Sequence, residues 1–306
     1  MAADTLVRTA TEPWAFTRVA VSRIVDLTPT FRRFALRSID DVRLADPGFD
    51  QRIKVVPPSP AGIDAMPTDP EWYARWRAMP EGERPPFRTF TIRGVEHGEL
   101  LVDVALHGPE GPAARWAGAA RLGDELLVLG PNAAHPGPYG GVDFVPPARC
   151  GHHLLAGDET AAPAIARILE QLPPEARGTA VVELPDPRDA AYLPPHPGFA
   201  VHVLARAGRP HGDALVERVT AVAAEHLEAH PGVEPEPVDI DQELLWEVPR
   251  NARGGAALKS ASLYAWLAGE AGAITAIRRH LVTELGIDRR AVAFMGYWRQ
   301  GRAENS

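Results

Sequence analysis

Residues 88–91 combine side chains that could hold a phosphorylated aromatic cofactor. The segment reads Arg-Thr-Phe-Thr. A guanidinium pairs with phosphate oxygens in a charge-assisted contact, whereas an aromatic ring and a hydroxyl can meet the face and the edge of a flat heterocycle such as a flavin. Residues 111–117 (GPAARWA) predict the start of a short helix, whose N-terminal N–H groups favour an anion. The alternative is that both segments are ordinary strand and helix residues.

Residues 156–160 (AGDET) are a second candidate, because they join a buried strand to a helix. In an open α/β sheet, ligands bind beyond the carboxyl ends of the strands. Asp158, Glu159 and Thr160 could equally be capping residues that suit the start of the helix. Two carboxylates would also repel a pyrophosphate, so this turn does not predict a tight dinucleotide cradle.

A similar turn, AGE at residues 268–270, follows a later strand. Glu270 is either another helix cap or part of a turn in which Gly269 admits a flat ring. Taken alone, neither turn decides between structure and function.

Two cations alternate with apolar residues in the predicted strand RIKVV at residues 52–56. The two-residue period of a strand places Arg52 and Lys54 on one face. A Pro-rich loop follows at once, as expected beside the entrance for a bulky anionic substrate. The alternative is a solvated strand edge, where exposed charges are common.

Several familiar kinds of site are excluded. The chain has no HExxH, GxSxG, P-loop or GxGxxG motif after a strand. Its one cysteine, Cys150, excludes an intrachain disulfide and a multi-thiolate metal site. His152 and His153 are neighbours on a predicted strand, so they point to opposite faces and cannot chelate one ion together. We therefore expect no metal bound by the protein itself.

The composition is that of a folded, acidic protein. The chain has 306 residues, 45% of them hydrophobic, and its 32 basic and 40 acidic residues give a formal charge of −8. This composition excludes wholesale disorder and argues against nonspecific nucleic-acid binding. No segment approaches the ~18 apolar residues of a membrane helix, and the first residues resemble no signal peptide. We expect a cytoplasmic protein without membrane insertion.

The hydrophobic pattern changes in the middle of the chain. Before the Gly- and Pro-rich linker at 131–147 it predicts short strands and a single short helix, which favours a small antiparallel barrel. After the linker, strands alternate with helices, which favours an open parallel sheet with helices on both faces. Residues 231–260 are expected to form an irregular insertion. The predicted fold is therefore an antiparallel β-barrel over residues 14–148 and a parallel-sheet α/β domain over residues 149–306. The expected strands are residues 15–25, 31–39, 52–56, 88–95, 99–107 and 125–130, then 152–157, 179–184, 200–206, 263–269 and 291–298.

Five segments in order carry a family resemblance: RTFT, DVALHGPEGPAARWA, LLAGDETAAPAIARILEQLP, YAWLAGEAGAITAIRRHLVTELGI and GYWRQG. Together they resemble the siderophore-interacting proteins, which are ferric-siderophore reductases of the ferredoxin-reductase superfamily. The resemblance covers roughly residues 15 to 301. It implies that the barrel binds FAD and that the α/β domain binds NADPH or NADH.

The resemblance also implies roles for single residues. Arg88 should pair with the FAD pyrophosphate, Phe90 should lie against the flavin, and Thr91, as the catalytic residue, should approach its N5 edge. The family usually has Tyr at Phe90 and Ser at Ala114, so FAD affinity should be lower here. The flavin-side residues would be Arg88, Thr89, Phe90, Thr91, Asp103, Ala105, His107, Pro112, Ala113, Ala114 and Trp116; the nicotinamide-side residues would be Asp158, Glu159, Thr160, Gly269, Glu270, Tyr297 and Trp298. The last two could instead be core aromatics.

The implied reaction is FAD-dependent reduction of a ferric siderophore, with Arg52 and Lys54 at the substrate and Fe(II) as product. Two alternatives stay open: another flavin reductase of the superfamily, and a non-catalytic siderophore-binding protein. The electron donor is also open. Glu183 could hold a ribose hydroxyl, whereas Arg206 and Arg209 could hold a 2′-phosphate. The oligomeric state is not predicted.

Overall fold

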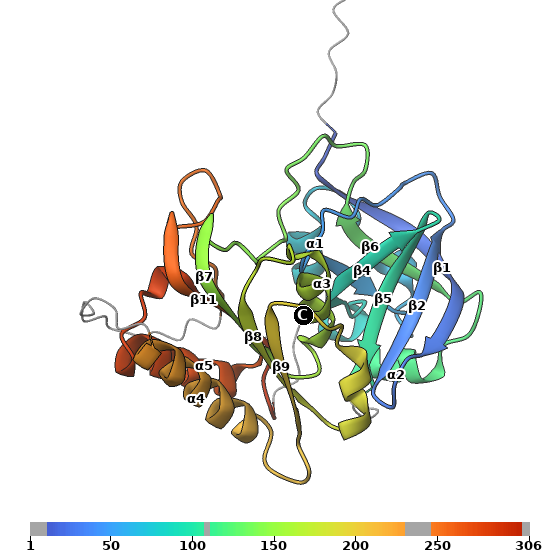
Figure 1. Cartoon of the computed structure of the whole chain (residues 1–306). Helices are drawn as coiled ribbons and strands as arrows, with labels where there is room; N and C mark the ends of the chain where they lie inside the picture. The colour runs from blue at the N-terminus through green and yellow to red at the C-terminus, as the bar shows by residue number, and fades with distance from the viewer. Residues whose placement is uncertain (1–10, 107–110, 230–245, 302–306) are drawn as a thin grey trace, which may run out of the picture.

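The first half of the chain is a closed barrel (Figure 1). The computed structural model describes residues 11–106, 111–229 and 246–301. Six strands close in the order β1-β2-β5-β4-β3-β6, and every neighbouring pair is antiparallel. Apolar side chains from alternate strand positions fill the interior, and the predicted barrel is confirmed. The strands are β1 (Trp14–Asp26), β2 (Phe31–Ser38), β3 (Arg52–Val56), β4 (Arg88–Glu96), β5 (Glu99–Ala105) and β6 (Glu125–Pro131).

The expectation of a single short helix in this half was wrong. Besides α2 (Pro112–Ala119), a helix α1 (Trp72–Ala78) forms between β3 and β4, between the 3₁₀ turns η1 (Ile63–Ala65) and η2 (Glu81–Glu83). Seven residues are too few for a stable isolated helix. Trp76 holds α1 in place, because its side chain is buried against Phe87. Tertiary contacts therefore stabilise this helix.

The second half is a six-stranded sheet in the order β10-β12-β11-β7-β8-β9. All neighbouring pairs are parallel except β10 with β12, which are antiparallel. The predicted parallel sheet is thus confirmed, with one short antiparallel edge strand that the sequence did not indicate. The strands are β7 (Arg149–Gly157), β8 (Gly178–Leu184), β9 (Phe199–Ala205), β10 (Trp246–Glu247), β11 (Ser260–Glu270) and β12 (Val292–Trp298).

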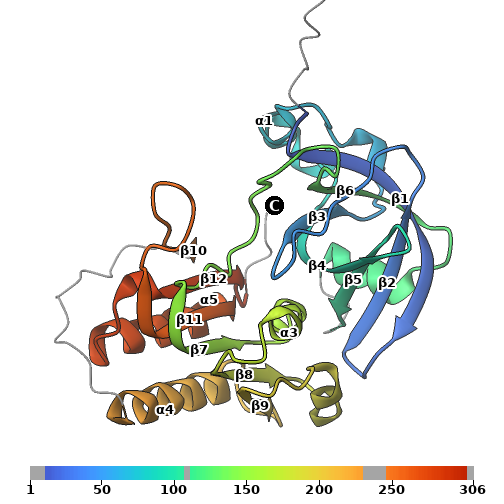
Figure 2. The ribbon, with the colours of Figure 1, turned by 45° about the horizontal axis from the view of Figure 1, so that its top comes forward.

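Helices cover both faces of this sheet, as predicted (Figure 2). α3 (Ala162–Gln171) lies on the face toward the barrel, and α4 (Asp213–Ala229) and α5 (Ala271–Arg279) lie on the other face. Shorter turns connect the elements: η3 (Pro187–Tyr192), the π-helical η4 (His280–Glu284) and η5 (Arg289–Ala291). Among the described helices, none is long and apolar enough to span a membrane.

Buried polar contacts hold the barrel against the sheet. Asp189 in η3 accepts hydrogen bonds from the Thr30 backbone N–H (2.9 Å) and the Thr28 hydroxyl (2.6 Å). The Tyr192 ring stacks on the buried Phe31 ring with 3.9 Å between centroids. Arg93 of β4 pairs with a carboxylate of α3 at 2.7 Å. The two halves therefore form fixed walls on either side of their junction. We propose the limits 14–148 and 149–306 for the two domains.

Candidate cofactor and substrate site

A cleft of about 770 Å³ opens between the barrel and the sheet. Clefts of this size at domain junctions are the usual place for small-molecule ligands. Most residues singled out from the sequence lie on its walls. The lining residues among them are Arg52, Lys54, Arg88, Thr89, Phe90, Thr91, Asp103, Ala105, Ala113, Ala114, Glu159, Thr160, Tyr297 and Trp298.

β4 presents its first residues to the cleft. Arg88 and Phe90 are half-buried and, two positions apart on a strand, share one face. Gly111, whose φ of 84° suits glycine, also lines the cleft where α2 begins. A guanidinium and a helix N-terminus at one cleft form a binding site for phosphates. These residues therefore fit a flavin dinucleotide.

Asp103 lines the cleft, and its carboxylate also has a structural role. Its carboxylate is buried and accepts from Arg33 (2.7 Å), Arg93 (3.1 Å) and the hydroxyl of Tyr192 (2.7 Å). Both oxygens are thus used to join β5 to its neighbours and to the second domain. His107 lies outside the described residues, and Pro112 is the first residue of α2.

The prediction of a cofactor contact for Trp116 is corrected. Its side chain lies in the barrel core, with its ring 4.6 Å from that of Phe34, and it does not line the cleft. On the amphipathic helix α2, Trp116 faces the barrel, while Ala113 and Ala114 face the cleft.

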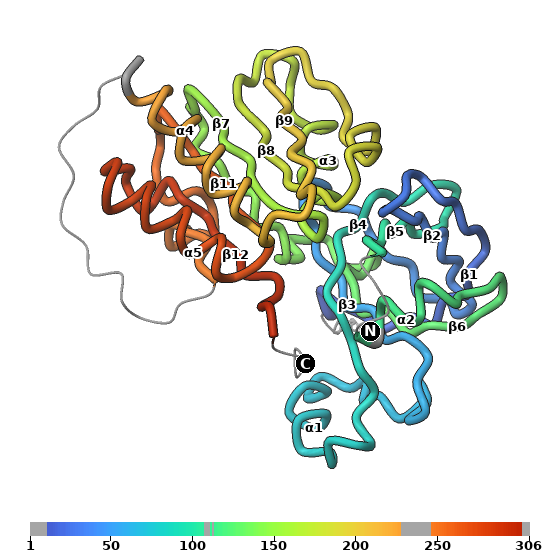
Figure 3. The backbone as a smooth tube through the Cα atoms, turned by 90° about the horizontal axis from the view of Figure 1, so that it is seen from below, coloured from blue at the N-terminus to red at the C-terminus, as the bar shows by residue number. Residues whose placement is uncertain are grey.

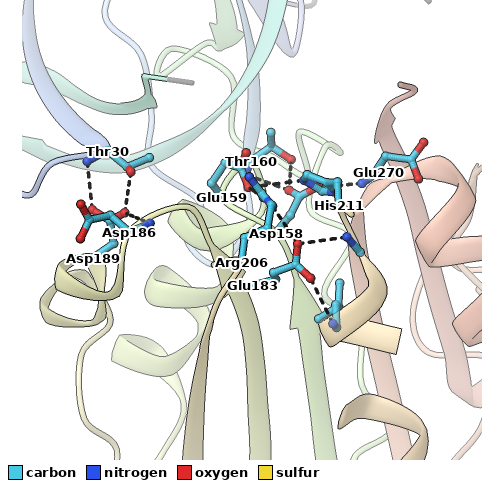
Figure 4. A network of polar contacts seen from close by, with 12 residues as sticks. Thr30, Asp158, Glu159, Thr160, Glu183, Asp186, Asp189, Arg206, His211 and Glu270 are labelled. Atoms are coloured by element: carbon cyan, nitrogen blue, oxygen red, sulfur yellow. Dashed lines mark hydrogen bonds and ion pairs between the residues drawn. The ribbon is translucent and has the colours of Figure 1, made fainter. Parts of the chain in front are cut away.

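The turn after β7 is organised by a buried carboxylate (Figure 4). Asp158 Oδ1 accepts from the backbone N–H of Thr160 at 2.9 Å. Its Oδ2 accepts from the Glu270 N–H at 2.8 Å and from the indole Nε1 of Trp298 at 2.9 Å. Gly269 makes room for this carboxylate, because a Cβ there would lie 2.7 Å from Oδ2. Asp158 therefore joins the ends of three strands.

This arrangement corrects three nicotinamide-side predictions. Asp158 and Gly269 lie behind the cleft wall and not on it. Glu270 caps α5 by accepting from the Ala273 N–H at 2.9 Å, so the capping interpretation is the right one for this residue. Glu159 and Thr160 remain on the wall, with Tyr297 and Trp298 opposite the barrel.

Behind Glu159 lies a compact cluster of charges, also drawn in Figure 4. Arg206 lies 2.6 Å from Glu159 and 2.9 Å from Glu183, and His211 lies 3.6 Å from Glu159. Although burial opposes ionisation, the His211 contact and the Arg206 charge lower the pKa of Glu159 to about 2. Burial and the neighbouring Glu159 charge raise the pKa of Asp158.

Several oxygens of this cluster already have partners. Arg206 pairs with Glu159 Oε2, and two N–H donors occupy one oxygen of Asp158. Asp158, Glu159 and His211 are close enough to share an ion, but Arg206 already balances the charge of Glu159. We assign no metal to these residues.

The three residues considered from the sequence for choosing the electron donor make contacts within the protein. The ribose interpretation of Glu183 was wrong, because its fully buried carboxylate accepts from the Gly212 and Leu215 N–H groups at the start of α4. Arg206 is held by two carboxylates, and Arg209 pairs with Glu217 at the surface (2.9 Å).

Glu159 gives a testable dependence of stability on pH. The pKa of about 2 in the folded protein is below the ordinary glutamate value of 4.5, so the unfolded chain takes up a proton first as the pH falls. Stability from Glu159 is present above about pH 4.5 and is lost toward pH 2. Glu159→Gln should therefore cost about 2 kcal/mol at pH 7 and show a shallower loss on acidification. Urea unfolding at pH 7, 4.5 and 3 measures both.

The surface residue Glu217 provides the matched control. Its side chain is 71% exposed, so Glu217→Gln should change stability little at any of these pH values. If Glu159→Gln keeps the acid dependence of the wild type, Glu159 is not the group whose ion pairs matter.

Arg52 and Lys54 line the opposite part of the cleft. The Arg52 guanidinium is 3.1 Å from Asp143 and lies 4.7 Å from the centre of the Trp246 ring. The Lys54 ammonium lies 4.8 Å from the centre of the Phe87 ring and 3.4 Å from the Thr89 hydroxyl. The two cations thus belong to a wall of rings and charges.

Several residues of this wall could not be predicted from the sequence. Trp246 comes from β10 and stacks against Tyr297 with 5.5 Å between ring centroids. Trp72 and Tyr73 come from α1. Both elements are short, and their sequences do not show which side chains face the barrel strands.

The architecture places the chain in a known class of fold. A closed antiparallel barrel followed by a parallel α/β sheet, with a cleft between them, is also the fold of the ferredoxin reductase in carbazole 1,9a-dioxygenase, which is 14% identical with a TM-score of 0.55 over 94% of this chain and 70% of that one. Two family models match the chain: the siderophore-interacting FAD-binding domain over residues 20–135 and the siderophore-interacting protein over residues 150–301. The chain belongs to the siderophore-interacting protein family, as its sequence motifs predict.

Known proteins show the same relationship. The solved siderophore-interacting protein SipS from Aeromonas hydrophila is 31% identical, with a TM-score of 0.64 over 95% of this chain and 94% of SipS. Ferric vibriobactin reductase ViuB of Vibrio cholerae is 28% identical over 225 residues, which are 73% of this chain and 68% of ViuB. The NADPH-dependent ferric-chelate reductase of Escherichia coli is 32% identical over 194 residues, 62% of this chain and 71% of that protein.

Proposed function

We propose that this protein reduces ferric siderophores and releases Fe(II), with FAD as bound cofactor and NADPH or NADH as electron donor. The observation that carries the proposal is one cleft whose barrel wall holds Arg88, Phe90 and Thr91 and whose sheet wall holds Glu159 and Thr160. Two similar proteins are named as a ferric vibriobactin reductase and a ferric-chelate reductase. Because nicotinamide nucleotides are intracellular reductants, we place the reaction in the cytoplasm.

The barrel wall would bind and orient FAD. When bound, FAD supplies the ability to accept a hydride and to pass on single electrons. Arg88 and the N–H groups at the start of α2 would hold the pyrophosphate, Phe90 would face the flavin, and the Thr91 hydroxyl would donate a hydrogen bond at its N5 edge. Thr89, Ala105, Ala113 and Ala114 line the same wall without bulky groups in the way.

The sheet wall would receive the nicotinamide nucleotide. Thr160 offers a hydroxyl, and Trp298, fixed by its hydrogen bond to Asp158, offers a ring in a set position. The described residues of this wall offer no cation to a phosphate, because Arg206 already pairs with the buried Glu159 at 2.6 Å. They would therefore favour the uncharged dihydronicotinamide end of the nucleotide. These residues align the two reacting rings, which is the main contribution a protein makes to hydride transfer.

Arg52 and Lys54 would dock the substrate. Ferric siderophores are often anionic, and a protein of net charge −8 offers no long-range attraction, so local cations are needed. The iron is substrate and arrives in its chelator. Siderophore oxygens are hard ligands that hold Fe(III) more strongly than Fe(II), so reduction itself loosens the metal.

The double variant Arg52→Gln with Lys54→Gln should raise the apparent KM for an anionic ferric siderophore by about three- to tenfold. Flavin reduction by NAD(P)H should stay unchanged, because it uses the other wall. Asp143 keeps a second partner in Arg250 at 3.3 Å, so the fold should tolerate the change. The double variant Arg23→Gln with Arg37→Gln, exposed on the barrel, is the control. Equal KM values for wild type and variant would remove this strand from the docking face.

One stepwise experiment tests the function. The protein is loaded with FAD, reduced anaerobically with NADPH or NADH, and then mixed with several ferric siderophores while the flavin absorbance is followed. We expect bleaching by the nucleotide and recovery on addition of the siderophore, with Fe(II) trapped by a ferrous chelator. If the protein binds no FAD, the result favours the alternative of a non-catalytic siderophore-binding protein. A flavin that is reduced but not reoxidised by any ferric siderophore belongs to a reductase with another acceptor.

A further inference from the structure

Two aromatic side chains of α1 form an open corner at the cleft. Tyr73 and Trp72 both line it, and their ring centroids are 5.4 Å apart with an angle of 71° between the planes. Tyr73 is 48% exposed and Trp72 is half-buried. Figure 3 shows α1 standing out from the barrel beside β3 and β4. The Arg77 guanidinium lies 6.0 Å from the centre of the Tyr73 ring. The corner thus brings two rings, set at a steep angle to one another, to the cleft.

The corner is held firmly from behind. Trp72 makes edge contacts with Phe87 and with Phe16 of β1, each at 5.6 Å between centroids. Tyr73 stacks over the buried Trp76 at 6.0 Å, and the Trp76 indole donates to the Pro85 carbonyl at 2.9 Å. Both rings are thus positioned before any ligand binds, which lowers the cost of binding one.

The direction of β4 shows what could reach this corner. The strand leaves the sheet side at Arg93, which pairs with Glu170 of α3. Going back along the strand, Thr91 and Phe90 come next, then Arg88, and then Phe87 against the Trp72 ring. FAD has the same linear order: its isoalloxazine ring, its pyrophosphate and its adenosine. With the flavin at Phe90 and the phosphates at Arg88, the adenosine continues toward α1.

We propose that Trp72 and Tyr73 form the platform for the adenine ring of FAD. This inference rests on the proposed function, because that proposal assigns FAD to the cleft. A purine matches the corner in chemistry: its face stacks on Tyr73 while its edge meets Trp72. Aromatic stacking tolerates the absence of base-specific hydrogen bonds. The platform would also add to the affinity for FAD. Phe90 and Ala114, which stand where the family usually has Tyr and Ser, are expected to lower that affinity.

Comparison of FAD with FMN tests the platform directly, because FMN lacks the adenosine. We expect Tyr73→Ala to weaken FAD binding by roughly tenfold to a hundredfold and to leave the FMN dissociation constant within about twofold. Tyr73→Phe keeps the ring and should restore FAD affinity. Arg75→Ala, on the same helix but away from the cleft lining, is the matched control. Flavin fluorescence titration gives each constant, and thermal melting shows that the variants are folded.

The outcomes separate this proposal from the proposed function. Wild-type protein that binds neither flavin would overturn the proposed function. Wild-type protein that binds FAD, with Tyr73→Ala losing FAD and FMN equally or losing neither, would overturn the adenine platform alone. Unchanged FAD affinity together with a raised KM for a ferric siderophore would assign the corner to the substrate.

Discussion

Replacing Arg88 by alanine is expected to weaken FAD binding by roughly tenfold to a hundredfold. A hydrogen bond between a charged side chain and a phosphate contributes on the order of 1.5–3 kcal/mol. Arg88 and the start of α2 both line the cleft, where they would hold the pyrophosphate. Titration of the apoprotein with FAD, followed by flavin fluorescence, measures the change. Unlike Tyr73→Ala, this variant should lose FMN affinity as well, because FMN also carries a phosphate.

Arg37→Ala controls for the loss of a barrel arginine. Arg37 pairs with Glu99 at 3.0 Å on the outside of the barrel, and its side chain is 68% exposed. The FAD affinity of the Arg37→Ala variant should match that of the wild type. An unchanged FAD dissociation constant for Arg88→Ala would show that the pyrophosphate lies elsewhere.

The second large effect is expected from Gly269→Val. Gly269 has φ of 143°, which L side chains rarely adopt, and its added Cβ would lie 2.7 Å from Asp158 Oδ2. The carboxylate would move away from the Glu270 and Trp298 N–H donors. Backbone strain and two disrupted buried hydrogen bonds together cost about 3–5 kcal/mol. Urea unfolding should show this loss, and flavin reduction by NAD(P)H should slow as Trp298 loses its fixed position.

Gly94→Val is the matched substitution in the barrel. Gly94 has an ordinary backbone conformation, and a Cβ there would meet nothing within 4 Å. Its stability should stay close to that of the wild type. If Gly269→Val were as stable as Gly94→Val and reduced flavin at the wild-type rate, the buried Asp158 junction would not position the nucleotide wall.

The fold was predictable where periodic apolar residues determine it. Along β1, buried residues alternate with half-buried ones. The helices α3 and α5 carry apolar residues at helical spacing. The two elements that were missed, α1 and β10, are seven and two residues long. Such short elements exist because of contacts with distant residues, which a local pattern does not contain.

The site was predictable in part. Arg88, Phe90 and Thr91 could be found because they adjoin one another in a motif. Trp116 was misplaced because a short helix between two partners does not reveal which face meets the barrel. Glu270 was open to two interpretations because a carboxylate at a helix start suits a cap as well as a ligand site. Trp246 could not be found, since it reaches the cleft from a strand that pairs only at the sheet edge.

The hydrogen bonds of Asp103 determine whether the two domains can be separated. Asp103 is bonded to Arg93 within the barrel and to Tyr192 across the junction, and Arg93 in turn pairs with Glu170 of α3. A barrel expressed alone would keep the buried Arg93 with one of its two carboxylate partners. The halves are therefore not exchangeable modules: a chimera that joins this barrel to another nucleotide-binding sheet needs a carboxylate at the Glu170 position and a hydroxyl at the Tyr192 position.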